Sequence, residues 1–120
     1  MGAAENRVWR RTVPAGDLVE GSLVRVDVAS SGGRRRATPV VVARVEGQLH
    51  AFEDSCPHAG WPLSDGDYDG RMVSCLRHFW EFDVVTGQSV VPSGWPLRKL
   101  PVSVDAEGFV LVDVWKQLYG

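Results

Sequence analysis

Two short segments of the sequence each combine a cysteine with a histidine. The first, CPH at residues 56–58, places a thiol and an imidazole two positions apart, and the second, CLRH at residues 75–78, places them three positions apart. These segments hold both cysteines of the 120-residue chain. Thiolates and imidazoles are ligands for zinc and for iron. The pairing therefore predicts a metal site, whose candidate ligands are Cys56, His58, Cys75 and His78.

The order of these ligands discriminates between metals. A zinc finger of the same composition groups its two cysteines and then its two histidines, whereas here each segment supplies one of each. The order Cys-x-His, sixteen residues, Cys-x-x-His is typical of a cluster in which two cysteines hold one iron and two histidines hold the other. We predict one [2Fe-2S] cluster, and a zinc-stapled interaction module is the alternative from a different class.

Composition and charge restrict the remaining function classes. With 44% hydrophobic and 23% charged residues, we expect a single domain spanning residues 1–120. The chain begins without the apolar run of a signal peptide and contains no apolar stretch of about 18 residues, so we expect a cytoplasmic protein without a membrane partner. In that reducing compartment two cysteines rarely form a structural disulfide.

The distribution of arginine argues against a nucleic-acid partner. Residues 1–52 hold 8 arginines and 5 acidic residues, whereas residues 53–83 hold 2 arginines and 7 acidic residues. The one basic run, at residues 34–36, follows a Ser-Ser-Gly-Gly stretch and is typical of a solvated loop. Because the cysteine segments lie in the acidic part, we expect no nucleic acid there.

Short apolar runs of strand length dominate the chain, and helical periodicity is almost absent. Turn residues such as Glu46-Gly47 separate the runs. The pattern predicts an all-β fold, an antiparallel sandwich or small barrel, with a tail that adds a helical turn or an irregular end. The expected strands are 8–13, 23–28, 40–45, 48–52, 71–74, 80–83, 89–91, 100–104 and 109–114.

On these motifs the chain resembles a Rieske-type [2Fe-2S] ferredoxin over nearly its whole length. The resemblance implies that Cys56 and Cys75 bind the buried iron and that His58 and His78 bind the outer iron. The segment VVPSGWPL resembles the third loop that covers the cluster in this family. The implied fold is a base of antiparallel strands that carries a cluster-binding subdomain of loops and short strands, at about residues 53–97.

The resemblance implies an electron carrier rather than an enzyme. Respiratory Rieske proteins have a disulfide between their ligand loops and two hydroxyl donors to cluster sulfur. This sequence has Trp61 and Arg77 at the disulfide positions, and Trp80 and Phe82 at the hydroxyl positions. Fewer donors to sulfur leave the reduced cluster less stabilised, so we expect a low potential for a Rieske centre. A low potential suits a donor to oxygenases.

The identity of the oxygenase rests on two positions. Most dioxygenase ferredoxins carry Pro and Gly where this chain has Leu76 and Phe79, and the loop CLRHFWEF resembles ferredoxins of the toluene 4-monooxygenase type. We therefore expect electrons to pass from an NAD(P)H-dependent flavin/iron-sulfur reductase to the hydroxylase component of a di-iron aromatic or hydrocarbon monooxygenase. The alternative is the ferredoxin component of a ring-hydroxylating dioxygenase. The third histidine, His50, lies outside both segments and is expected to be structural or exposed.

Overall fold

The computed structural model describes residues 6–29, 37–57, 60–76, 80–90 and 94–119. Every strand pair in this part of the chain is antiparallel, which confirms the predicted all-β fold. The elements in chain order are β1 (Trp9–Pro14), the 3-10 helix η1 (Ala15–Asp17), β2 (Leu23–Ala29), β3 (Ala37–Val45), β4 (Gln48–Glu53), the 3-10 helix η2 (Leu63–Asp65), β5 (Met72–Ser74), β6 (Glu81–Asp83), β7 (Lys99–Leu100), β8 (Val102–Val104), β9 (Phe109–Asp113) and the helix α1 (Trp115–Tyr119).

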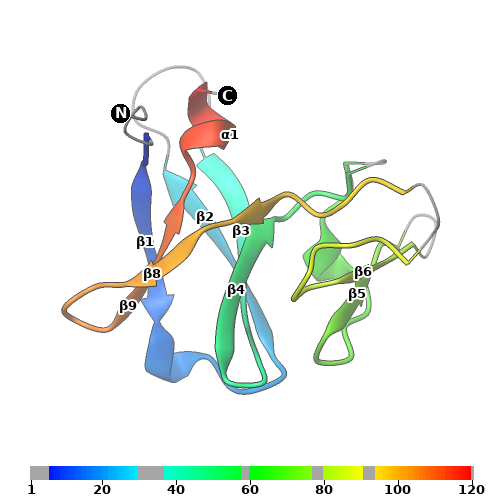
Figure 1. The fold of residues 1–120 in the computed structure, drawn as a ribbon, viewed down its shortest axis with the longest axis horizontal. Helices are drawn as coiled ribbons and strands as arrows, with labels where there is room; N and C mark the ends of the chain where they lie inside the picture. The colour runs from blue at the N-terminus through cyan, green and yellow to red at the C-terminus, as the bar shows by residue number, and fades with distance from the viewer. Residues whose placement is uncertain (1–5, 30–36, 58–59, 77–79, 91–93, 120) are drawn as a thin grey trace.

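The strands form three sheets, which lie side by side in Figure 1. One sheet, called the base sheet from here on, has the order β1-β9-β8, and a second has the order β2-β3-β4-β7. The third is the small hairpin β5-β6, at the opposite side of the molecule from the β8–β9 turn. The four-stranded sheet therefore stands between the base sheet and the hairpin that follows the first cysteine.

Strand β3 is buried on both faces, which accounts for its almost continuous apolar sequence. Side chains alternate across a strand, so Val40 and Val42 face one way and Val41 and Ala43 face the other. Val40 and Val42 belong to the core shared with β9, whereas Val41 and Ala43 belong to a second core that includes both cysteines. A central strand thus anchors the cysteine-bearing part on the base.

The tight turn predicted at Glu46-Gly47 joins β3 to β4. Both residues have positive φ, 52° and 78°, as the two central residues of a type I′ hairpin turn require. The Glu20 carboxylate accepts hydrogen bonds from the backbone N–H groups of Glu46 (2.5 Å) and Gly47 (2.8 Å). This turn therefore has a side-chain cap in addition to its favourable sequence.

Two expected strands differ in the structure. The strand expected at 100–104 is divided at Pro101, which follows β7 and precedes β8, because proline cannot donate a ladder hydrogen bond. The strand expected at 89–91 is wrong for its described part: Ser89 forms only an isolated bridge with Phe82, and Val90 lies in a bend. Residue 91 is outside the described residues.

The end of the described chain forms one helical turn, α1, one of the two outcomes expected for the tail. Asp113 precedes it and accepts hydrogen bonds from Trp115 N (3.0 Å), Val8 N (2.9 Å) and Arg7 Nη1 (3.1 Å). Burial acts to raise the pKa of Asp113, but these hydrogen bonds outweigh it and hold the pKa below its ordinary value. Within the described ranges, no helical segment is both long and apolar enough to cross a membrane.

Candidate metal centre

Both cysteines lie in the buried core on the β3 face that is directed away from the base sheet. Cys56 is 1% exposed and Cys75 is fully buried, and both belong to the cluster that also contains Phe52 and Phe82. No disulfide joins them. Two thiols buried in one apolar core, at the starts of two loops, are the donors that an anchored iron requires.

Each of the two cysteine loops is closed by a backbone hydrogen bond between equivalent positions. Cys56 N donates to Trp61 O at 2.8 Å, and Cys75 N donates to Trp80 O at 2.8 Å. Each bond connects a cysteine with the tryptophan five residues later, so each closes a loop of equal length. In the sequence, His58 and His78 fall inside these two loops. The equal closure of the two loops was not apparent from the sequence, because a tryptophan five residues after a cysteine does not by itself indicate a turn.

The histidines themselves fall outside the described residues, as do Arg77 and Phe79. The described part contains no group of three or more His, Cys, Asp or Glu side chains placed to hold a metal ion. The structure thus brings together two of the four expected ligands, Cys56 and Cys75. The other two, His58 and His78, stay predictions from the sequence.

The segment after the first loop holds the second loop in register. Ser74, the residue before Cys75, donates its backbone N–H to Asp67 O at 2.9 Å. Gly66 lies so close to this strand that a β-carbon on it would stand 1.7 Å from the Ser74 carbonyl oxygen. Its φ of −87° is open to any residue, so glycine is required here by contact and not by backbone conformation.

A third segment returns beside the first loop. Leu97 N donates to Gly87 O at 2.7 Å, and Glu53 N donates to Arg98 O at 2.9 Å. Pro57 and the residues from Trp95 to Arg98 line a hollow of about 430 Å³ between this segment and the first loop. Residues 94–97, the described end of the segment VVPSGWPL, therefore lie against the first cysteine loop.

The surface around the two loops is rich in exposed apolar side chains. Trp61 is 43% exposed, Leu76 is 45%, Val90 is 57% and Trp95 is 60%. All four belong to the two cysteine loops or to the third segment. Trp9, Val19 and Val104 are exposed elsewhere on the chain. Because large exposed apolar side chains that gather in one region often mark a protein–protein contact, the four on these loops define the candidate docking face.

A carboxylate and an arginine close the turn that follows the second loop. Asp83 accepts hydrogen bonds from Arg71 Nη2 (3.1 Å) and from Val85 N (2.8 Å). Burial acts to raise the pKa of Asp83, but the Arg71 guanidinium and the backbone donors of Val85 and Thr86 outweigh it, and the pKa lies below its ordinary value. The hairpin is thus fixed by a charged side chain that stays ionised.

His50 lies in β4, outside both loops, as expected. Its Nδ1 is 3.0 Å from Lys99 Nζ, and the same ammonium group donates to Val85 O at 2.6 Å. Burial, followed by the neighbouring Lys99 charge, lowers the pKa of His50, and burial lowers the pKa of Lys99. The pair connects the four-stranded sheet with the turn after β6, so His50 has a structural place.

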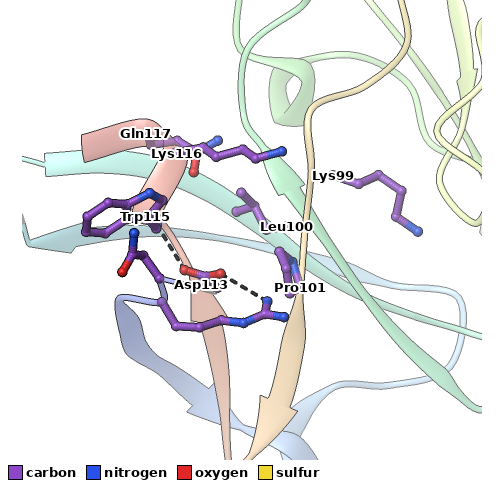
Figure 2. Close-up of a pocket in the computed structure, with 9 residues that line it drawn as sticks. Lys99, Leu100, Pro101, Asp113, Trp115, Lys116 and Gln117 are labelled. Carbon is purple, nitrogen blue, oxygen red and sulfur yellow. Dashed lines mark hydrogen bonds and ion pairs between the residues drawn. The ribbon is translucent and has the colours of Figure 1, made fainter. Parts of the chain in front are cut away.

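A separate pocket of about 500 Å³ lies beside α1, with Leu100, Trp115 and Lys116 among the residues that line it (Figure 2). The Lys99 side chain extends away from α1 in this view, toward its partners His50 and Val85. The pocket borders the base sheet and α1, and none of its lining residues belongs to the cysteine loops. It has no part in the candidate metal centre.

Sequence reasoning missed one buried group close to this centre, the carboxylate of Asp54. Its side chain is fully buried two residues before Cys56, and its partners are Ser64 and Arg25. An acidic residue at the end of a strand is ordinarily read as the start of a turn. The one signal of burial in the sequence was the position of Asp54 between the apolar strand 48–52 and Cys56.

Comparison with known proteins decides the family. The Rieske [2Fe-2S] domain profile matches residues 8–101. The chain belongs to the Rieske [2Fe-2S] domain family. It therefore carries one [2Fe-2S] cluster, and the buried thiols of Cys56 and Cys75 fit the thiolate half of such a site. This Rieske protein is an electron carrier rather than a catalyst.

Several Rieske relatives match over most of their length. The ferredoxin component of biphenyl 2,3-dioxygenase from Rhodococcus jostii is 34% identical over 83% of this chain and 87% of the relative. Ferredoxin CarAc from Metapseudomonas resinovorans is 36% identical over 89% of this chain and 94% of the relative. A solved complex of reduced oxygenase and oxidized ferredoxin in carbazole 1,9a-dioxygenase has a chain with a TM-score of 0.71 and 34% identity, covering 90% of this chain and 94% of that one.

Proposed function

We propose that this Rieske ferredoxin carries single electrons from an NAD(P)H-dependent flavin/iron-sulfur reductase to the oxygenase component of an aromatic ring-hydroxylating dioxygenase. The observation that carries the proposal is the match, along nearly the whole length, to ferredoxin components of biphenyl, carbazole and naphthalene dioxygenase systems. These comparisons favour the alternative over the di-iron monooxygenase expected from Leu76 and Phe79. Two loop positions carry less weight than similarity over about one hundred residues.

Within that function, we assign the four ligands in two pairs. Cys56 and Cys75, both buried, hold the inner iron, and His58 and His78 hold the outer iron. Burial of the thiolates and the equal closure of the two loops support this pairing. The cluster-binding part then spans about residues 53–97 of a single domain, and a histidine pair on the outer iron gives the electron a short route to a partner.

Reconstitution tests the proposed partner. The reduced protein is expected to support product formation by the oxygenase component of a biphenyl or carbazole dioxygenase, at a rate at least about tenfold above that with the hydroxylase of a toluene monooxygenase. Reductase and NADH supply the electrons, and product is measured per NADH consumed. Cys75→Ser is the control for transfer that bypasses the cluster. The opposite preference would restore the monooxygenase interpretation and reject the dioxygenase partner.

The acidic segment between the cysteine loops provides a second test, of how partners approach. Asp65 and Asp67 are exposed, and the Asp67 carbonyl binds the residue before Cys75. Fixed surface charge near a docking face raises association rates by steering an oppositely charged partner. Asp69 is unsuited to the test, because its carboxylate accepts hydrogen bonds from the backbone of Arg71 (3.0 Å) and Met72 (2.7 Å) and so holds the turn.

We expect the double variant Asp65→Lys, Asp67→Lys to lower the second-order rate of electron transfer by about tenfold at low salt and to flatten its salt dependence. Stopped-flow reduction at several ionic strengths measures both effects. The control is Asp17→Lys with Glu107→Lys, which makes the same change in net charge on the base of the molecule. Equal rates in the two double variants would show that net charge alone matters and would reject local steering.

A further inference from the structure

Asp54 places a carboxylate in the protein interior next to the first cysteine. Its Oδ1 accepts a hydrogen bond from Ser64 N (2.8 Å), and its Oδ2 lies 2.5 Å from Ser64 Oγ and 3.3 Å from Arg25 Nη1. The Asp54 side chain is 0% exposed, whereas that of Arg25 is 40% exposed. Taking a carboxylate out of water is unfavourable unless partners compensate it, and the three polar contacts of Asp54 supply that compensation.

The contacts of Asp54 hold the two ends of the first cysteine loop together. Asp54 precedes the loop and Ser64, in η2, follows it, so the carboxylate joins the residues on either side of the segment from Cys56 to Pro62. The backbone N–H of Asp54 also donates to Pro39 O at 2.9 Å, which ties the same point to β3. Cys56 is thus held between a strand of the sheet and η2.

Asp54 lies two residues before Cys56, the proposed ligand. Two residues of extended chain span at most about 7 Å, so the α-carbons of Asp54 and Cys56 are no farther apart than this. Reduction adds one electron to the cluster, and a fixed negative charge nearby disfavours the added charge. Burial weakens screening by water and salt, and half-exposed Arg25 offsets the carboxylate only in part.

We propose that Asp54 is a positioning residue that holds the Cys56 loop and, through its buried charge, lowers the reduction potential of the cluster. Arg25 acts in the opposite direction, as a partly exposed counter-charge, and Ser64 contributes only hydrogen bonds. The inference rests on the proposed ligation of the cluster by Cys56. It makes the potential of this protein depend on a charge outside the ligand set and outside the docking face.

Potentiometry of the holoprotein separates charge from geometry. Asp54→Asn is expected to shift the ratio of oxidised to reduced cluster, at a fixed ambient potential, at least about threefold toward the reduced form, which is about 28 mV at 59 mV per tenfold for one electron. Arg25→Gln is expected to shift it in the opposite direction by a smaller factor, and Arg25→Lys, which keeps the charge, is expected to leave it unchanged. Ser64→Ala is expected to speed loss of iron to a chelator without a comparable shift in potential.

Asp105→Asn is the matched control. Asp105 also pairs with an arginine, Arg11 (2.7 Å), and accepts hydrogen bonds from two backbone N–H groups, those of Phe109 (2.9 Å) and Glu107 (3.0 Å). It lies in the β8–β9 turn, on the far side of the molecule from β5 and β6 (Figure 1). This variant is expected to lower stability without moving the potential, so any general effect of losing a carboxylate is measured separately.

Two results would overturn the inference: a wild-type potential in Asp54→Asn with an intact electron paramagnetic resonance (EPR) spectrum, or shifts of the same sign in Asp54→Asn and Arg25→Gln. If Asp54→Asn binds too little cluster for titration, the comparison of Arg25→Gln with Arg25→Lys decides, and equal potentials in those two variants reject the role of charge. Wild-type protein that contains zinc and no sulfide would overturn the proposed ligation instead, which is a different failure.

Discussion

Replacing either cysteine with serine is expected to abolish the cluster. Wild-type protein should contain about two iron and two labile sulfide per chain, and Cys56→Ser or Cys75→Ser should contain less than about a tenth of that. A serine hydroxyl is not deprotonated at neutral pH and is a hard donor, whereas the thiolate is the form that binds iron. Iron and sulfide analysis, with the EPR spectrum of the reduced protein, measures the loss.

The same substitutions should also weaken the fold. Cys56 and Cys75 occupy one buried core, at the starts of two loops that have no other covalent link. A cluster that binds both loops contributes to folding, as metal sites generally do. Ser55→Ala, next to Cys56, is the control and should keep the full cluster. A normal cluster in either cysteine variant would remove that cysteine from the ligand set.

Gly66→Ala is expected to give the second largest loss. Its new β-carbon would lie 1.7 Å from the Ser74 carbonyl oxygen and 2.9 Å from the carbonyl carbon. These are backbone atoms of the residue before Cys75, so relieving the clash requires the backbone at Gly66 and the backbone that leads into the second cysteine loop to move apart. We expect cluster content to fall by at least about half and the free energy of unfolding to fall by about 2 kcal/mol or more.

Gly16→Ala is the matched control for that substitution. A β-carbon on Gly16 would meet no atom within 4 Å, and its φ is not in the left-handed region. Its effect on stability should stay within about 0.5 kcal/mol. Iron analysis and denaturant titration of both variants test the prediction, and wild-type cluster content in Gly66→Ala would show that the two cysteine loops do not depend on this contact.

The sequence predicted most of the strands because their signals are local. Alternating or continuous apolar runs and turn residues such as Glu46-Gly47 act within a few positions of the chain. The bend at Ser89 and Val90 was missed for the opposite reason. This segment has strand-forming residues and runs beside β6, where Val90 N donates to Glu81 O. In the described structure it forms a single bridge, Ser89 with Phe82, before the bend at Val90, and strand propensity alone does not make a ladder.

The kind of cofactor was also readable from the sequence, because ligand chemistry depends on residue type and spacing, while the four ligands Cys56, His58, Cys75 and His78 stay predictions. Cysteine and histidine paired in two segments identified the Rieske cluster before any fold was known. The choice between oxygenase partners was not readable in this way. It depends on surface contacts with another protein, and two residues of one loop do not determine such contacts.

Tertiary structure alone decided how the two cysteine loops are held relative to each other. Val41 and Ala43 alternate with Val40 and Val42 in one apolar run, and only folding assigns one pair to the cysteine core and the other to the base. The burial of Asp54 against Ser64 and the close approach of Gly66 to Ser74 likewise join residues ten and eight positions apart. Contacts of this kind arise from packing across loops, whose geometry has no short-range signature in the chain, and they set the position and the electrostatic surroundings of Cys56 and Cys75.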